Sequence, residues 1–194
     1  MHDYTKYYKP TKNDVVLDCG ACVGESATTL FRHCKQVICV EPDMFNLFLL
    51  YKHVRKLKNM LVVNAALSDH RGIIRFFRSE PEFSCDDNAG CVMLDKLKHR
   101  DLRYSFVVGD TVDNIMGYLY VPVVDVVKMD IQGSEVSALD GAVNTLKDVR
   151  YIAVESHVVH GMSTSGFIVD FLERHGFVVT VENNEGDVVY GVKK

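Results

Sequence analysis

The chain has no long hydrophobic run: no apolar stretch among its 194 residues approaches the ~18 residues of a membrane span. Its N-terminal segment, MHDYTKYYKPTKND, lacks the uninterrupted apolar core that a signal peptide needs. Positive charge is not in excess either, because 22 Lys and Arg stand against 26 Asp and Glu, a net charge of −4. A global positive field that would gather nucleic acid or anionic lipid is therefore absent. These absences predict a cytoplasmic protein that binds neither nucleic acid nor membranes.

No second closely spaced cysteine pair accompanies Cys19 and Cys22, so the usual ligand pattern of a zinc site is missing. The chain has six cysteines, and Cys19 and Cys39 lie within apolar, strand-like runs. We therefore expect reduced, buried thiols rather than disulfides, as in a reducing compartment.

Six short runs are nearly continuous in Val, Ile and Leu, instead of alternating between apolar and polar residues. Such runs are typical of strands that are covered on both faces in a parallel sheet. They are residues 15–18, 37–42, 60–66, 124–130, 151–157 and 177–182.

Between these runs, two sets of apolar residues recur at the spacing of a helix face. The sets are Val136, Leu139, Val143 and Leu146, and Phe167, Ile168, Phe171 and Leu172. A further helix is expected over residues 44–57, with Asp43 as its N-cap. Alternating strands and helices predict an α/β fold with an open, doubly wound and mostly parallel sheet. With 47% hydrophobic and 25% charged residues, a single domain over residues 1–194 is expected.

Two parts of the chain depart from this alternation of strands and helices: the C-terminal end and the middle. Residues 183–186, Asn-Asn-Glu-Gly, separate two β-rich runs, which predicts a hairpin and an antiparallel last strand. Between Gly72 and Pro122 the pattern is looser: IIRFF indicates a strand, SEPEFSCDDNAG a polar loop, and MLDKLKHRDLRYSFVVGD is ambiguous. We expect structure specific for the substrate in this insertion, with a lid from residues 79–104 as one alternative.

The stretch VVLDCGACVGES, residues 15–26, predicts a strand that ends in a glycine turn and opens a helix. A dinucleotide site would require G-x-G-x-x-G, whereas this turn has only Gly20 and Gly24, with Ala21 after the first glycine. Asp18, at the end of the strand, would repel a phosphate and attract a cation. The turn therefore predicts a ligand with positive charge at this end.

Glu41 stands seventeen residues after Gly24, at the end of the next predicted strand. A carboxylate there can accept both hydrogen bonds of a ribose diol. A nucleoside with a cationic tail and no phosphate satisfies both requirements, and S-adenosylmethionine (SAM) has an ammonium, a sulfonium and a ribose. NAD meets only the ribose requirement.

The glycine turn VLDCGACVGESATTL resembles that of class I SAM-dependent methyltransferases. Three later segments are similar to the FkbM branch: TVDNIM (111–116), VKMDIQGSEVSALDGA (127–142) and YIAVESH (151–157). The resemblance implies a Rossmann-like seven-stranded sheet of order 3-2-1-4-5-7-6 with strand 7 antiparallel, and methyl transfer from SAM, usually to a hydroxyl oxygen. It implies that the cofactor contacts Asp18, Gly20, Ala21, Gly24, Glu41, Ala66, Leu67 and Ser68. At position 132 the chain departs from the family, which commonly has an acidic residue where Gln132 stands.

Four titratable residues are expected beside the reacting methyl group, where an open α/β sheet places its ligands. They are Asp130, Glu135, Glu155 and His157. His157 is favoured as the general base because its unperturbed pKa of ~6.5 suits proton abstraction near neutrality. Asp130 could instead orient the acceptor or bind a divalent cation, but Asp130 with Gln132 is a thin set of ligands, so no metal site is favoured.

The leading hypothesis is a SAM-dependent O-methyltransferase acting on a sugar, a polyketide or a similar metabolite. An RNA or protein methyltransferase is the alternative within the same fold, although Asp130-Ile-Gln-Gly replaces the Asn/Asp-Pro-Pro-aromatic turn of many base N-methyltransferases. A noncatalytic SAM-binding module is the alternative from another class, and Gln132 keeps it open. The sequence is compatible with a homo-oligomer and does not identify the acceptor.

Overall fold

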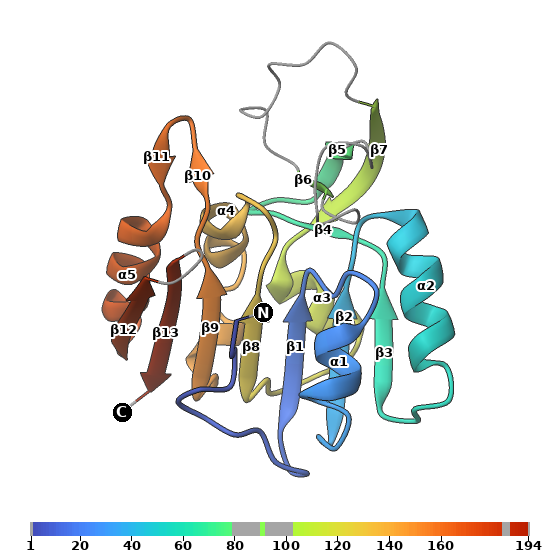
Figure 1. Cartoon of the computed structure of the whole chain (residues 1–194), viewed down its shortest axis with the longest axis horizontal. Coiled ribbons are helices and arrows are strands. Elements are labelled where there is room, and N and C mark those ends of the chain that lie inside the picture. Colours follow the sequence, from blue (N-terminus) through green and yellow to red (C-terminus); the bar gives the residue numbers. More distant parts are fainter. Residues whose placement is uncertain (1, 79–89, 92–102, 184–186, 194) are drawn as a thin grey trace.

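A seven-stranded sheet forms the centre of the computed structural model, which describes residues 2–78, 90–91, 103–183 and 187–193 (Figure 1). The strand order is β12-β13-β9-β8-β1-β2-β3. These strands are β1 (Val15–Cys19), β2 (Gln36–Val40), β3 (Met60–Val63), β8 (Val126–Met129), β9 (Tyr151–Glu155), β12 (Phe177–Asn183) and β13 (Asp187–Lys193). Strand β13 is antiparallel to both of its neighbours, and the pairs from β9 to β3 are parallel. The expected order, with the antiparallel last strand, is confirmed.

Most strands of the sheet are buried on both faces, as their non-alternating sequences predicted. The edge strand β12 differs, because Val178 and Val181 are 47% and 39% exposed, so this prediction was wrong for residues 177–182. In β1, Val15, Leu17 and Cys19 belong to one hydrophobic cluster, whereas Val16 belongs to the other. The first cluster includes residues of helices α3 (Val112–Tyr118), α4 (Glu135–Asp140) and α5 (Ser165–Arg174). The second includes residues of α2 (Met44–Val54) and of the short helix α1 (Glu25–Thr29). The thiols of Cys19 and Cys39 are free and buried, as expected.

Helix α2 begins as predicted, because the Asp43 side chain accepts hydrogen bonds from the backbone N–H groups of Phe45 (2.8 Å) and Asn46 (3.0 Å). It ends at Val54, three residues before the predicted boundary. The 3₁₀ helix Thr145–Lys147 follows α4 after a break at Gly141. A Cβ atom on Gly141 would lie 2.2 Å from the Ser68 carbonyl oxygen, so the chain turns at a close backbone contact.

That break explains why one predicted helix face is incomplete. Leu139 and Leu146 are buried, but Val143 is 36% exposed because the helix ends before it. Phe167 in α5 is 60% exposed, although Ile168, Phe171 and Leu172 are buried as predicted. Each predicted helix face therefore includes one exposed residue, Val143 in the first and Phe167 in the second.

The N-terminal segment lies against the sheet, with the N-terminus near the upper ends of β8 and β9 (Figure 1). Tyr8 stacks on Tyr151 of β9 with ring centroids 5.6 Å apart. The Tyr151 hydroxyl donates a hydrogen bond to the Tyr4 carbonyl oxygen (3.0 Å), and the Tyr190 hydroxyl of β13 donates to that of Asp3 (3.2 Å). This segment therefore covers part of the sheet that the short α1 does not reach.

A second sheet, of order β4-β7-β5-β6, lies beyond the carboxyl ends of the main parallel strands (Figure 1). It contains β4 (Ala66–Leu67), β5 (Gly72–Arg78), β6 (Gly90–Cys91) and β7 (Arg103–Asp110), and a further two-stranded sheet joins β10 (Val158–Val159) to β11 (Met162–Ser163). The predicted strand IIRFF is part of β5, and the ambiguous RYSFVVGD forms β7. The predicted run 60–66 splits because β4 pairs with β7 instead of continuing β3.

Three predictions fall wholly or mainly outside the described residues: the polar loop 79–90, the lid 79–104, and the tip of the terminal hairpin at residues 184–186. The hairpin itself is confirmed by the antiparallel pairing of β12 with β13. Among the helices that the structure describes, none has the length and apolar character needed to cross a bilayer.

Candidate active site

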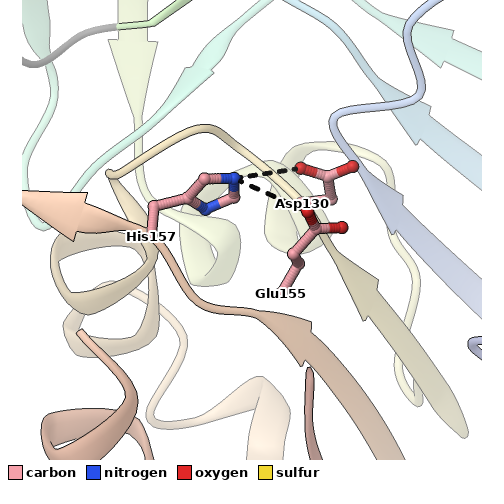
Figure 2. Close-up of side chains that lie close together, drawn as sticks. All are labelled: Asp130, Glu155 and His157. Atoms are coloured by element: carbon pink, nitrogen blue, oxygen red, sulfur yellow. Dashed lines mark ion pairs between the residues drawn. The ribbon is translucent and has the colours of Figure 1, made fainter. Parts of the chain in front are cut away.

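Asp130, Glu155 and His157 lie together at the carboxyl ends of β8 and β9 (Figure 2). Asp130 directly follows β8, Glu155 is the last residue of β9, and His157 lies two residues further. Because β8 and β9 are parallel neighbours, their ends bring these side chains to one place. His157 Nε2 is 3.9 Å from Asp130 Oδ1 and 3.8 Å from Glu155 Oε1. Three of the four predicted catalytic residues thus share one site.

The fourth, Glu135, lies behind His157. It is the first residue of α4 and is fully buried, and its Oε1 accepts a hydrogen bond from His157 Nδ1 (2.9 Å). The same oxygen accepts from the backbone N–H of Gly133 (3.0 Å). Donation from Nδ1 to this carboxylate fixes the imidazole so that Nε2 faces Asp130 and Glu155. Burial alone lowers the pKa of His157, but the hydrogen bond and charge of Glu135, with Asp130 and Glu155, raise it above its usual value.

Tyr4, which was not predicted from the sequence, completes this cluster. Its hydroxyl lies 3.2 Å from Asp130 Oδ2 and also contacts Glu155 Oε2. Tyr4 is buried, and this burial together with the two carboxylates raises the pKa of its hydroxyl. Tyr4 therefore stays protonated and can donate to a carboxylate. Its only signal in the sequence is an aromatic residue in a polar N-terminal segment.

Gln132, the departure from the family pattern, contacts the same cluster. Its Nε2 donates a hydrogen bond to Asp130 Oδ1 (2.9 Å). The residue has a left-handed backbone, with φ of 55°, and Gly133 follows with φ of 107°. The amide thus helps to orient Asp130 within a tight turn between β8 and α4.

The glycine turn lies beside this cluster. Gly20, Cys22 and Gly24 all have positive φ values, of 74°, 49° and 91°. A Cβ atom on Gly20 would lie 1.9 Å from the Asp130 carbonyl oxygen, and one on Gly24 would lie 2.7 Å from Leu50 Cδ1. Gly20 is therefore required both by close backbone packing and by its conformation, whereas Gly24 is required by its conformation, because the Leu50 side chain can move.

The sequence predicted that Asp18 presents a free negative charge to a ligand at the turn. This prediction was wrong. Asp18 is fully buried within β1, and Lys128 Nζ of β8 lies 3.3 Å from its Oδ1. Lys128 Nζ also donates to the carbonyl oxygen of Gly20 (2.8 Å) and lies 5.3 Å from the centre of the Tyr4 ring. Burial alone lowers the pKa of Lys128, but Asp18 and Asp130 raise it above its usual value. This lysine, a cation within an otherwise apolar run, was not singled out from the sequence.

Glu41 joins the turn to α2. It is buried, its Oε2 accepts from the backbone N–H of Cys22 (3.0 Å), and its Oε1 accepts from that of Asp43 (2.9 Å). Burial raises the pKa of Glu41 to about 7, although these N–H groups oppose the rise. Asn46 Nδ2 also donates to Glu41 Oε1 (3.5 Å). A carboxylate has about four lone-pair positions, so these three contacts still leave acceptor capacity for the ribose.

Replacing Glu41 with glutamine is expected to remove a pH dependence of stability. A folded pKa of about 7, above the ordinary value of 4.5, means that only the unfolded chain releases this proton between those pH values. The free energy of unfolding of the native protein should therefore fall as pH rises through this window, by at most about 1.4 kcal/mol per pH unit from this group. Urea unfolding across the window measures the slope.

The matched control is Glu25→Gln, at an exposed carboxylate that stays in water in both states. Its slope should equal that of the native protein, whereas the slope of Glu41→Gln should be shallower. Equal slopes for all three proteins would show that Glu41 does not titrate in this way.

The remaining predicted cofactor residues are buried near the same edge of the sheet: Ala21, Ala66, Leu67 and Ser68. Asn64 Nδ2 donates to the carbonyl oxygens of Glu41 (2.9 Å) and Pro42 (3.0 Å), which holds the β3–β4 connection beside the end of β2. The turn, Glu41 and this connection thus form one continuous border beside Asp130. A surface pocket lined by Val15, Tyr120 and Asp125, by contrast, lies at the amino end of β1, away from these residues.

Comparison with known proteins agrees with the fold of the chain. The family model described as Methyltransferase FkbM domain matches residues 18–179. The crystal structure of methyltransferase FkbM from Methylobacillus flagellatus KT has a TM-score of 0.67 at 19% identity, and the match covers 95% of this chain and 45% of that one. The chain therefore spans less than half the length of that protein. No curated protein sequence matches the chain.

Two other solved structures share the fold. Fibrillarin from Aeropyrum pernix, in complex with natively bound SAM, has a TM-score of 0.57 at 13% identity, covering 97% of this chain and 71% of that one. An rRNA methylase from Streptococcus thermophilus has a TM-score of 0.57 at 9% identity, covering 95% and 89%. At these identities the likeness shows the fold alone.

Proposed function

Because the chain belongs to the FkbM methyltransferase family, we propose that it transfers the methyl group of SAM to a hydroxyl oxygen of a small-molecule or glycan acceptor. The observation that carries the choice of a hydroxyl is the orientation of His157. Its Nδ1 is held by Glu135 while its Nε2 faces two carboxylates at the edge of the sheet where α/β proteins bind ligands. A hydroxyl acceptor must lose a proton during the reaction, and this cluster offers a base.

The residues at the carboxyl ends of β1 and β2 fit SAM. In this proposal the turn from Gly20 to Gly24 holds the amino-acid end and Glu41 accepts hydrogen bonds from the ribose, while Ala66, Leu67 and Ser68 border the adenine. Asp18 acts from within the protein, where it pairs with Lys128 and supports the turn. SAM supplies an electrophilic methyl group on its sulfonium.

The residues beyond the turn then act on the acceptor. Asp130 and Glu155 accept hydrogen bonds that orient the acceptor, and His157 Nε2 takes the proton of its hydroxyl. Glu135 stabilises the imidazolium that forms, because its carboxylate accepts from Nδ1. Holding the acceptor oxygen in line at near-attack distance supplies much of the rate.

Replacing His157 with glutamine tests the proposal. Glutamine cannot take the proton, so the rate of methyl transfer should fall on the order of 100-fold or more. The rate is measured by mass spectrometry of sugar and polyketide acceptors incubated with methyl-labelled SAM.

The control is His160→Asn, at an exposed histidine three residues further along the chain. Asparagine is chosen because it tolerates the left-handed backbone of residue 160, where φ is 51°. This variant should retain the native rate. Equal rates for the native protein and His157→Gln would contradict the assigned role of His157.

A further inference from the structure

We infer that Asp130, Glu155 and His157 form a binding site for one divalent transition-metal ion. The inference deepens the proposed function, on which its catalytic role depends, but the binding of the ion can be measured independently. The three donor atoms are Asp130 Oδ1, Glu155 Oε1 and His157 Nε2, and all lie within 4.8 Å of one another (Figure 2).

The spacing of these atoms is close to that of a coordinated ion. Around a tetrahedral Zn²⁺ with ligand distances of about 2.0–2.2 Å, neighbouring donor atoms lie about 3.4 Å apart. The distances from His157 Nε2 are 3.8 Å to Glu155 and 3.9 Å to Asp130. Each side chain would need to move only by a few tenths of an ångström to reach bonding distance.

Groups outside the site hold each of the three ligands in orientation. Tyr4 contacts Asp130 Oδ2 and Glu155 Oε2, the oxygens that do not face His157. Glu135 accepts from His157 Nδ1, the nitrogen that faces away from the two carboxylates. Hydrogen bonds of this kind to metal-binding carboxylates and histidines fix their orientation and typically increase metal affinity. The three donor atoms, Asp130 Oδ1, Glu155 Oε1 and His157 Nε2, are thereby left facing one another.

The sequence analysis did not favour a metal because it considered Asp130 with Gln132. In the structure, Gln132 Nε2 donates to Asp130 Oδ1, so the amide supports a ligand and does not replace one. Glu155 and His157 instead supply the further donors. His2 Nε2 lies 3.7 Å from Glu155 Oε1, so the N-terminal segment borders this side of the site.

One imidazole with two carboxylates suits Mn²⁺ or Zn²⁺ better than Mg²⁺, which prefers oxygen donors and near-ideal octahedral geometry. Three protein ligands leave an open position, as in catalytic sites. There the ion would bind the acceptor hydroxyl and lower its pKa, so that the proton passes to solvent. In this form of the enzyme His157 is a ligand, and the ion takes over the activation of the acceptor.

Binding of Mn²⁺ alone to the full chain tests the inference. The protein is first treated with EDTA and dialysed, and the free ion is followed by electron paramagnetic resonance. The native protein should bind one Mn²⁺ per chain, and Zn²⁺ should displace it. Asp130→Asn and His157→Gln should lose stoichiometric binding, whereas His160→Asn should retain native affinity.

The variant Tyr4→Phe tests whether Tyr4 orients the metal-binding carboxylates without itself binding the ion. It removes only the hydroxyl that contacts the outer oxygens, so the affinity for Mn²⁺ should fall by about 10-fold or more while the stoichiometry remains one. Circular dichroism and thermal unfolding establish that each variant is folded. Absence of stoichiometric Mn²⁺ and Zn²⁺ binding by the native protein, or equal binding by all folded variants, would overturn the inference.

Measuring methyl transfer in EDTA distinguishes failure of the metal-site inference from failure of the proposed function. Loss of activity in EDTA with recovery on adding Mn²⁺ supports the metal site and methyl transfer to a hydroxyl, with His157 acting as a ligand in place of the general base. Undiminished transfer in EDTA overturns the catalytic role of the ion and leaves the proposed function standing. Stoichiometric Mn²⁺ binding without methyl transfer to any hydroxyl acceptor would contradict the proposed function and retain the site.

Discussion

Lys128→Met is expected to lower the free energy of unfolding by roughly 3 to 5 kcal/mol, because it leaves the buried carboxylate of Asp18 without its cation. Asp18 is fully buried, and Lys128 is 4% exposed. The substitution also removes a hydrogen bond to the Gly20 carbonyl oxygen, so the turn itself loses support. Urea unfolding monitored by circular dichroism measures the loss.

Two further variants identify the cause of this loss of stability. Lys58→Met, at an exposed lysine, should change the stability by less than about 0.5 kcal/mol. Asp18→Asn combined with Lys128→Met removes both charges and should cost less than Lys128→Met alone, because no uncompensated charge remains. If Lys128→Met unfolds with native stability, the pair is not charged in the folded protein.

Gly20→Ala is expected to destabilise the protein by roughly 2 to 4 kcal/mol, from the left-handed backbone and from steric overlap. The added Cβ would lie 1.9 Å from the Asp130 carbonyl oxygen and 2.9 Å from its carbonyl carbon. Because backbone atoms form this contact, no side-chain rotation relieves it. Thermal and urea unfolding measure the effect.

Gly117→Ala is the matched control. Gly117 lies within α3, and no described atom would fall within 4 Å of its new Cβ. Because alanine favours a helix over glycine, this variant should be stabilised by about 0.5–1 kcal/mol. An equal response of the two variants would show that the turn is not tightly packed against Asp130.

The strands of the sheet could be predicted because each carries a strong local signal in the sequence. In the run Val15–Asp18, for example, the first three residues are all apolar, which indicates burial on both faces, and the family resemblance supplies the order of the strands. The helix expected around Val143 shows the limit of such patterns. Helical spacing continues past Gly141, but α4 ends at Asp140, and Gly141 lies close to the backbone of Ser68, a residue far away in the sequence.

The candidate site could be predicted where its residues follow parallel strands. Asp130 and Glu155 meet for that reason, and His157 follows β9 closely. Tyr4 could not be found in this way, because its contacts with Asp130 and Glu155 join residues 126 and 151 positions apart. No periodicity of the N-terminal segment reports such a contact.

Asp18 shows where the electrostatic argument from the sequence was wrong. The carboxylate was expected to attract a positively charged ligand, but Lys128 balances it inside the protein. The signal was present, since Lys128 is a cation within an apolar run. A buried lysine requires an anionic partner, and Asp18 lies on the neighbouring strand in direct register with it.

We propose that the chain moves the methyl group of SAM to a hydroxyl oxygen beside Asp130, Glu155 and His157. The most direct measurement is the position of the label in the product formed by the native protein from methyl-labelled SAM and the acceptor panel. The account predicts a labelled methyl ether, formed at a much lower rate by His157→Gln. Label found only on nitrogen or carbon, or on RNA, would contradict it.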